Sequence, residues 1–349
     1  MNARSACRGR LALLAAAVGL AGCTQHGASP PPAATARVLP AAPAAVAFTP
    51  PPRRAIPDDA FGAVVRQGEA LFTRTGQAAP QFVGNALTCQ NCHLDAGRLA
   101  DSAPLWAAWV GYPVYRSKTG HVNTFAERLQ GCFRFSMNGK APPLGDPVLV
   151  ALESYSYWMA TGAPTHVTLA GAGYPILPQP EQTPDRVRGK AVYTAKCSIC
   201  HGAEGRGREA WGRLAFPPLW GPDSFNWGAG MGNVNLAAGF IKANMPLGNG
   251  WSLSDQEAWD VALYVDSQER PQDPRYTGDV AETRARFHAT PRSMYGRVVD
   301  GHVLGSVAPQ AGARPRPPSA DRPAAAAFVR RRGRAAPATP QPRTTKEQP

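Results

Sequence analysis

The two ends of this 349-residue chain lack most of what a folded core needs. Residues 24–54 are rich in proline and alanine with almost no aromatic side chains, and residues 305–349 are mainly Pro, Ala and Arg with one aromatic residue, Phe328. Such segments cannot bury enough apolar surface to offset the entropy of ordering the chain. We expect both to be disordered, which leaves about 250 residues, enough for two domains of about 125 residues each.

Acidic residues are absent from residues 1–54, which carry six arginines, and residues 305–349 carry nine basic residues against two acidic ones. These two segments account for the whole formal net charge of +13, so the part expected to fold is neutral. A nucleic-acid-binding domain would carry its basic residues on the folded surface. The distribution therefore argues against nucleic acid as a partner, and we expect the arginines at 330–332 to be part of a solvated tail.

The apolar stretch 11–21 near the N-terminus is too short to cross a bilayer and follows three arginines, which is the layout of a secretory signal. It ends at Leu20-Ala-Gly-Cys23, which resembles the cleavage site of bacterial lipoproteins, where the cysteine becomes the lipid-bearing N-terminus. Ordinary cleavage nearby, with Cys23 a bystander, is the alternative. We predict a signal peptide over residues 1–23, a linker over 24–54, and a periplasmic protein that is lipid-anchored to a membrane through Cys23.

Two copies of the pattern C-x-x-C-H are the strongest chemical signal in the chain. The residues that form them are Cys89, Cys92 and His93 in the first copy, and Cys197, Cys200 and His201 in the second. The pattern is that of c-type haem attachment, because two thiols can form thioethers to the porphyrin and the histidine can bind the iron. Zinc would need four ligands, and a redox dithiol gives the histidine no role. The sequence predicts two covalently bound haem c groups.

Helix signals surround both motifs. We expect helices over residues 56–74, 125–137, 146–160 and 184–195, and one more after Ser254; Thr124 and Ser254 each open a capping box. The Gly/Pro-punctuated segments 217–221 and 226–230 are expected to be loops that wrap the haem edge. The predicted fold class is all-α, with two tandem cytochrome c-like domains over 55–178 and 179–304, one haem in each, and a disordered tail over 305–349.

The ligand opposite each histidine decides between electron transfer and chemistry. For the second haem we predict Met245, because Pro246 favours extended backbone at the residue before it, with Met231 as the competitor. For the first haem the candidates are Cys132, His121 and Met137.

Cys132 also has two polar neighbours on its predicted helix. Arg128 and Ser136 lie four residues before and after it, so the three side chains face the same way. A guanidinium can grip an oxyanion with two donors. The alternative is a solvated helix face, with Arg128 paired to an acidic residue.

The segment from Leu129 to Gly139 is similar to the distal-cysteine segment of dihaem thiosulfate dehydrogenases, and the segment from Phe240 to Pro246 looks like their second-haem methionine loop. The resemblance covers roughly residues 57–275, with both haem motifs in the same order. It implies that Cys132 and Met245 are iron ligands, and that Arg128, Ser136 and Arg116 line the substrate face. Some members place a lysine directly before the methionine, where this chain has Asn244.

The resemblance implies an oxidoreductase that joins two thiosulfates into tetrathionate, reversibly or not. Two electrons would pass from the first haem through the second to a soluble or membrane-bound cytochrome. Two alternatives remain at the level of sequence. One is a dihaem electron carrier without substrate chemistry, which leaves Cys132 unexplained. The other is a subunit like the sulfur-oxidising cytochrome that loads sulfur onto a carrier protein, which activity of the isolated chain on thiosulfate would distinguish.

Overall fold

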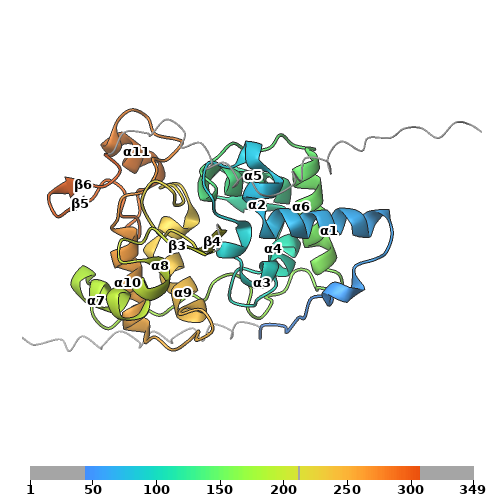
Figure 1. Ribbon diagram of the computed structural model, residues 1–349, viewed down its shortest axis with the longest axis horizontal. Helices are drawn as coiled ribbons and strands as arrows, with labels where there is room; N and C mark the ends of the chain where they lie inside the picture. The colour runs from blue at the N-terminus through green and yellow to red at the C-terminus, as the bar shows by residue number, and fades with distance from the viewer. Residues whose placement is uncertain (1–43, 211–212, 307–349) are drawn as a thin grey trace, which may run out of the picture. The chain divides into compact units, whose positions relative to one another are not determined.

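The computed structural model describes residues 44–210 and 213–306 (Figure 1). The predicted signal peptide with Cys23, most of the predicted linker and almost all of the predicted tail lie outside the described residues. Within the described ranges, none of the helices combines the length and the apolar character needed to cross a membrane.

The first half of the described chain is built on two long helices, α1 (Ala60–Thr73) and α6 (Pro147–Met159), which pack against each other (Figure 1). Gly68 permits the close approach, because a Cβ atom there would lie 2.1 Å from the Ala151 carbonyl oxygen. The shorter elements of this half are η1 (Arg53–Ala55), α2 (Thr75–Ala78), η2 (Pro80–Phe82), η3 (Cys89–Asn91), α3 (Leu94–Gly97), α4 (Leu105–Val110), the hairpin β1 (Val114–Arg116) and β2 (His121–Asn123), α5 (Phe125–Gly131) and the π-helical turn η4 (Cys132–Ser136).

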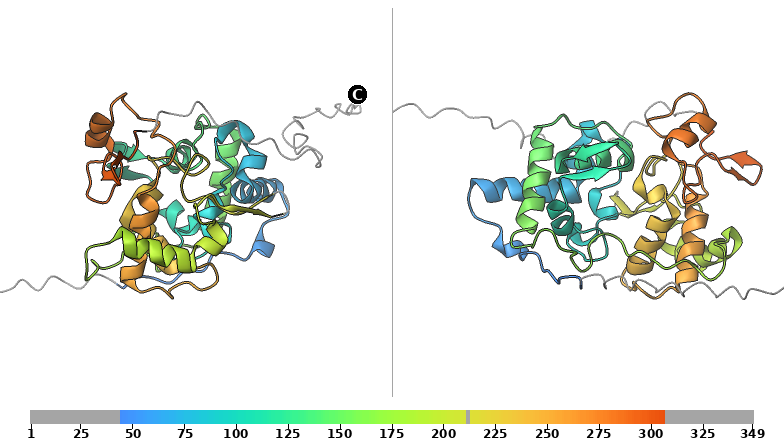
Figure 2. Two further views of the ribbon diagram at one scale, coloured as in Figure 1. Left: turned by 60° about the vertical axis from the view of Figure 1, so that its left-hand side comes forward. Right: turned by 180° about the vertical axis from the view of Figure 1, so that it is seen from behind.

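The second half is also built on long helices that pack against each other. Its helices α7 (Arg186–Lys196) and α9 (Val234–Asn244) both pack on α10 (Asp255–Asp266) (Figure 2). Gly189 of α7 meets α10 as Gly68 meets α6: a Cβ atom there would lie 2.0 Å from the Asp260 carbonyl oxygen. The remaining elements are α8 (Ser198–His201), the hairpin β3 (Arg208–Ala210) and β4 (Arg213–Phe216), η5 (Gly230–Gly232), α11 (Val280–Phe287) and the hairpin β5 (Val298–Val299) and β6 (His302–Val303).

The largely helical fold agrees with the sequence analysis, whereas the three short antiparallel hairpins were not anticipated. Both predicted capping boxes are present at the starts of α5 and α10. Two helices begin later than predicted, because Asp59 and Asp185 cap them with their carboxylates. The predicted helix 125–137 is α-helical only to Gly131 and continues as the π-helical turn.

The buried apolar side chains form one large cluster in the first half and two smaller ones in the second. Phe225 and Ala229 belong by sequence to the second half but lie in the cluster of the first. The predicted linker also contributes: the Val46 amide donates to the Thr168 carbonyl oxygen at 2.8 Å, and the Phe48 ring lies 5.4 Å from that of Trp106. Its last residues therefore pack on the fold, because they carry apolar side chains among the prolines.

Candidate functional site

A cavity in the first half contains most of the residues predicted for the first haem. Its empty volume is about 770 Å³, including the part that opens to solvent, and apolar side chains form most of its wall. The predicted residues that line it are Cys89, Cys92, His93, Arg128, Cys132, Ser136 and Met137. The structure therefore brings the first C-x-x-C-H motif and the predicted distal residues to one place, although 39 positions separate His93 from Cys132.

The His93 ring is oriented by its Nδ1 atom, which lies 2.7 Å from the Ala103 carbonyl oxygen. This hydrogen bond leaves Nε2 as the nitrogen for a metal. Burial lowers the pKa of His93 to about 4, which keeps the imidazole in the neutral form that binds iron. Burial also raises the pKa of the Cys89 and Cys92 thiols to about 12, as expected of sulfurs that face an apolar wall.

Arg128 and Cys132 are in direct contact. The Arg128 Nη1 atom donates to the Cys132 Sγ atom at 2.9 Å, as the spacing of four residues on a helix predicts. The charge of the sulfur raises the pKa of Arg128. Ser136 lies in the same cavity wall. Arg116, on β1, is half-buried; burial and then the charge of Arg128 lower its pKa, so the two guanidinium groups act on each other.

The other candidates for the first haem differ in position. His121 is exposed and its Nε2 atom lies 3.1 Å from Glu127 Oε1, which ties this ring to the surface. Met137 is buried in the cavity wall. Met231, the competitor of Met245 for the second haem, also lines this cavity.

The second C-x-x-C-H motif repeats the geometry of the first. The His201 Nδ1 atom lies 2.9 Å from the Pro217 carbonyl oxygen, and burial lowers the pKa of His201. Burial raises the pKa of Cys197 to about 11. Met245 follows α9 with φ −123° and ψ 145°, the extended backbone that the following proline predicts. The loop 217–221 thus contributes a carbonyl that orients the second histidine.

Buried donors without a protein partner test whether the site fits haem c, whose porphyrin carries two carboxylates. Within the described part of the chain, the Trp227 Nε1 atom and the Arg270 Nε and Nη1 atoms are buried and have no hydrogen-bond partner. The Arg270 guanidinium lies 4.4 Å from the centre of the Phe225 ring and 5.1 Å from that of Trp227. Buried donors of this kind suit carboxylates. Together with the paired thiols and oriented histidines, they fit haem c.

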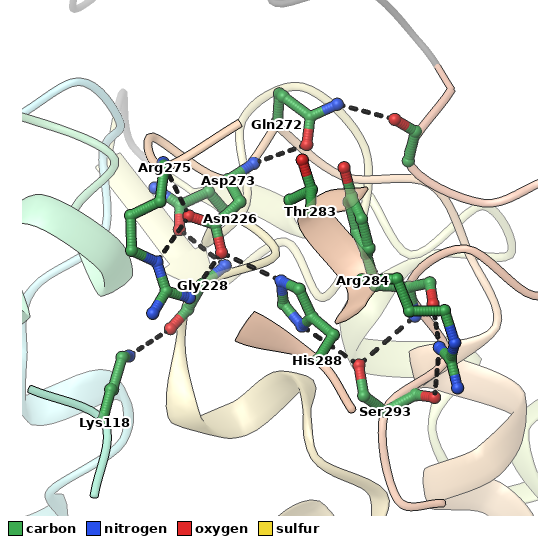
Figure 3. Close-up of polar contacts among 12 residues, drawn as sticks. Lys118, Asn226, Gly228, Gln272, Asp273, Arg275, Thr283, Arg284, His288 and Ser293 are labelled. Atoms are coloured by element: carbon green, nitrogen blue, oxygen red, sulfur yellow. Dashed lines mark hydrogen bonds and ion pairs between the residues drawn. The ribbon is translucent and has the colours of Figure 1, made fainter. Parts of the chain in front are cut away.

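Lys118 is a cation near Arg128 that the sequence analysis did not place in the site; the residue as a whole is exposed, whereas its amine end is partly buried. It lies between β1 and β2, and its Nζ atom donates to the Gly228 carbonyl oxygen (Figure 3). The Nζ atom also lies 3.7 Å from the centre of the Phe135 ring. Burial, and then the charges of Arg275 and Arg128, lower the pKa of Lys118 to about 7. The sequence gives no signal that this lysine contacts Gly228 and lies near Arg275, because both residues are far from it along the chain.

Comparisons with known proteins agree with this geometry. Residues 187–269 match the family model of cytochrome c. The chain is 61% identical over 260 residues to the thiosulfate dehydrogenase of Thiomonas intermedia, an alignment of 74% of this chain and 83% of that protein. It is 53% identical over 260 residues to the thiosulfate dehydrogenase of Stutzerimonas stutzeri, which covers 74% of this chain and 85% of the relative.

A solved structure is similar as well. The structure of the thiosulfate dehydrogenase TsdBA from Marichromatium purpuratum superposes with a TM-score of 0.72 at 54% identity. The alignment covers 74% of this chain and 57% of that one, so this chain spans a little over half of the solved chain's length. With a cytochrome c module, a cavity that fits haem c and these relatives, the chain belongs to the thiosulfate dehydrogenase family.

Proposed function

We propose that the Cys132 sulfur is the reacting atom with which this cytochrome c oxidises thiosulfate, and that the product is tetrathionate. The observation that carries the proposal is the 2.9 Å contact between Arg128 Nη1 and Cys132 Sγ, inside the cavity that also holds Cys89, Cys92 and His93. A sulfur that served only to fill space would need no cation. A guanidinium beside it stabilises a thiolate and attracts an anionic substrate.

We further infer that the chain holds two haem c groups. The first would be bound by Cys89 and Cys92, with His93 and Cys132 as iron ligands. The second would be bound by Cys197 and Cys200, with His201 and Met245 as iron ligands. The matching bonds from the histidine Nδ1 atoms to Ala103 and Pro217 support the duplication. When bound, each haem accepts one electron, and the pair delivers two electrons to an external cytochrome, soluble or membrane-bound.

Positive charge is the main physical requirement of the reaction. Two dianions brought to about 4 Å repel each other by about 4 kcal/mol in bulk water, and by more in a partly dry cleft. The cations near Cys132 that act on one another electrostatically are Arg116, Lys118 and Arg128. Ser136, in the same cavity wall, supplies a hydroxyl donor for a sulfonate oxygen.

The proposed covalent chemistry at Cys132 proceeds in two steps. The thiolate joins the outer sulfur of one thiosulfate, which forms a Cys–S–S–SO₃⁻ adduct and releases two electrons. The outer sulfur of a second thiosulfate then attacks the sulfane sulfur of the adduct, which is the sulfur bonded to Cys132 Sγ. The bond to Cys132 breaks, the thiolate is regenerated as the leaving group, and tetrathionate carries two negative charges away. No proton is taken up or released in either step.

The proposed location follows from the N-terminal sequence, which lies outside the described residues. A signal peptide directs the chain to the periplasm, where covalent haem attachment takes place in bacteria, and lipid on Cys23 holds it at a membrane. Replacing Cys23 with serine would release the protein from the membrane fraction if the cysteine carries the anchor.

The decisive experiment compares Cys132→Met with Met137→Leu, because Met137 lines the same cavity and is the alternative ligand. We expect Cys132→Met to retain both haems by absorbance yet to lose thiosulfate-dependent reduction of ferricyanide by at least about 1,000-fold. Electron paramagnetic resonance of the oxidised wild-type protein should show a thiolate-ligated low-spin signal that this variant lacks. Met137→Leu should keep both properties.

Three outcomes would count against the proposal. Unchanged turnover in Cys132→Met would show an electron carrier without chemistry at this sulfur. A wild-type protein without the thiolate signal, whose low-spin signal of the first haem is lost in Met137→Leu and kept in Cys132→Met, would assign the ligand to Met137. A wild-type chain that reacts with thiosulfate only when a carrier protein is added would identify a sulfur-loading subunit instead.

A further inference from the structure

The π-helical turn η4 leaves its backbone carbonyls in need of partners. In a π-helix the carbonyl of residue i accepts a hydrogen bond from the amide of residue i+5. Here the Met137 amide donates to the Cys132 carbonyl oxygen at 2.9 Å, and the Gly139 amide donates to the Phe133 carbonyl oxygen. The chain then leaves the helix. The Phe135 carbonyl keeps a local donor, the Asn138 amide at 3.4 Å, whereas the Arg134 and Ser136 carbonyls accept hydrogen bonds from other segments. Partly buried carbonyls also need donors, and here most of the donors come from elsewhere in the chain.

Asn226 supplies the donors for two of these carbonyls. Its side-chain Nδ2 atom donates to the Arg134 carbonyl at 3.0 Å, and its backbone amide donates to the Phe135 carbonyl at 3.2 Å. The second hydrogen of the same Nδ2 atom reaches Asn138 Oδ1 at 3.0 Å, and the side-chain oxygen accepts from the Gly228 amide at 3.1 Å. Every polar atom of this amide is therefore used, and the Asn226 residue is 0% exposed.

Asn85 supplies the donor for the third carbonyl and ties the same two segments together. Its Nδ2 atom donates to the Ser136 carbonyl at 2.9 Å and to the Ser224 carbonyl at 3.1 Å, while its side-chain oxygen accepts from the Leu87 amide. Asn85 is 4% exposed. The loop 224–228 is thus bonded directly and through Asn85 to the turn that starts at Cys132.

The loop and the turn also lie next to a third segment, which carries Asp273 and Arg275 (Figure 3). Gly228 approaches Phe135 so closely that a Cβ atom would lie 2.4 Å from Phe135 Cδ1. The Arg275 guanidinium lies 4.9 Å from the centre of the same ring and is fixed by Asp273, whose carboxylate accepts two bonds from it, at 2.6 and 2.9 Å. Asp273 also accepts from His288 at 2.9 Å. These contacts pack the Phe135 ring of the turn between Gly228 of the loop and Arg275, so the turn and the loop are packed together as well as hydrogen-bonded.

We propose that Asn226 is a positioning residue for catalysis: through its bonds to the η4 turn it fixes where Cys132 and Ser136 stand in the cavity. The inference rests on the proposed function, because it assumes that the Cys132 sulfur reacts. Its physical basis is that an α-helix continued past Gly131 would direct the residues after Cys132 differently from the π-helical turn. Displacing a reacting group by about 1 Å costs about 100-fold in rate, so a support of this kind acts on turnover more than on binding.

Two substitutions at Asn226 and one control separate positioning from general stability. Asn226→Ala removes the side-chain bonds. Asn226→Asp keeps the oxygen that accepts from the Gly228 amide but faces the Arg134 carbonyl with a second oxygen in place of the donor. Asn233→Ala is the control, because this partly exposed asparagine follows the same loop and its Nδ2 atom donates only to the Gly230 carbonyl, at 3.2 Å. All three are studied as the haem-loaded full-length protein.

We expect both Asn226 variants to lower kcat for thiosulfate by about 10- to 100-fold, with KM changed less than about threefold. The thiolate signal in electron paramagnetic resonance should shift or split, since the sulfur would take more than one position. Asn226→Asp should be no better than Asn226→Ala, and Asn233→Ala should match the wild type in rate and spectrum.

The inference is overturned if the thiolate signal and kcat are unchanged in both Asn226 variants, or if they lose only thermal stability. Restoration of activity by Asn226→Asp would also overturn it, because the donor to Arg134 would then be irrelevant. Failure of the proposed function would look different: the wild-type protein itself would show no thiolate signal, or Cys132→Met would keep full activity.

Discussion

Substitution of Arg128 by methionine removes the charge next to the proposed reacting sulfur while keeping a similar side-chain volume. In the structure the Arg128 Nη1 atom lies 2.9 Å from Cys132 Sγ, in a cavity whose remaining wall is largely apolar. The substitution therefore leaves the sulfur without its donor and the substrate without its nearest cation. Haem attachment should be unaffected, since Cys89, Cys92 and His93 keep their surroundings.

The size of the effect can be estimated from two contributions. A hydrogen bond to a charged group is worth about 1.5–3 kcal/mol, which corresponds to about 10- to 150-fold in rate or affinity. The attraction between a guanidinium and a thiosulfate dianion at about 5 Å is about 7 kcal/mol at an effective dielectric constant of 20, most of which desolvation of the two ions offsets. We expect kcat/KM for thiosulfate to fall about 100-fold in Arg128→Met. Arg128→Lys keeps the charge but loses the planar fork, so about 10-fold should be lost.

The assay is steady-state reduction of ferricyanide by thiosulfate at two ionic strengths, with Arg134→Met as the matched control. Arg134 is exposed on the same turn and changes the net charge by the same amount. The control should lose less than about twofold, and that loss should vanish at high salt. Equal losses in Arg128→Met and Arg134→Met would refute the reasoning, because the effect would then come from overall charge and not from contact with Cys132.

Two further predictions concern the contacts behind the site. Burial and the charges of Arg275 and Arg128 lower the pKa of Lys118 to about 7, whereas the unfolded chain keeps this amine protonated to about pH 10. The unfolded state therefore binds more protons between about pH 7 and 10, so the folded wild type becomes more stable as the pH rises through this range. The thermal midpoint of the wild type should increase relative to that of Lys118→Met between pH 7 and pH 9. A difference between the two midpoints that does not change with pH would contradict this. Asp273→Asn should lower the free energy of unfolding by about 3–5 kcal/mol in chemical denaturation, because it leaves Arg275 and His288 without their buried partner. The control is Asp300→Asn at an exposed carboxylate. An equal loss in the two variants would contradict the buried pairing.

The sequence predicted those parts of the site that depend on local spacing. The C-x-x-C-H motifs give the predicted attachment residues, the capping boxes mark where α5 and α10 begin, and the interval of four residues predicts the contact of Arg128 with Cys132. These features need only the geometry of one helix or one short motif. The family resemblance added the choice of Cys132 over His121, whose side chain is exposed and paired with Glu127; the choice stays a prediction.

The π-helical turn could not be predicted in the same way, because its partners are remote. The Asn226 side chain that donates to the Arg134 carbonyl is 92 residues from Arg134 in the sequence. Asn85, which donates to the Ser136 carbonyl, is 51 residues from Ser136. Neither asparagine has a local pattern that distinguishes it from a residue in an ordinary turn. The segment 226–230 is predicted to wrap a haem edge; in the structure its Asn226 also bonds to the first half of the chain, which the sequence did not predict.

The same loop leads along the chain into α9, the helix that precedes Met245, the proposed ligand of the second haem. Residues 224–228 bond to the turn that carries Cys132, and α9, which ends just before Met245, begins only a few residues later, where the Val234 amide donates to the Arg292 carbonyl. The stretch between them contains η5 and the buried Gly232, so it is short and held at both ends. A shift of the Cys132 turn would therefore strain the path to α9, and a shift of α9 would strain the turn. The mechanical consequence is that the segments carrying the two proposed distal ligands keep a fixed relation, which would suit electron transfer from the proposed reacting sulfur to the proposed second haem.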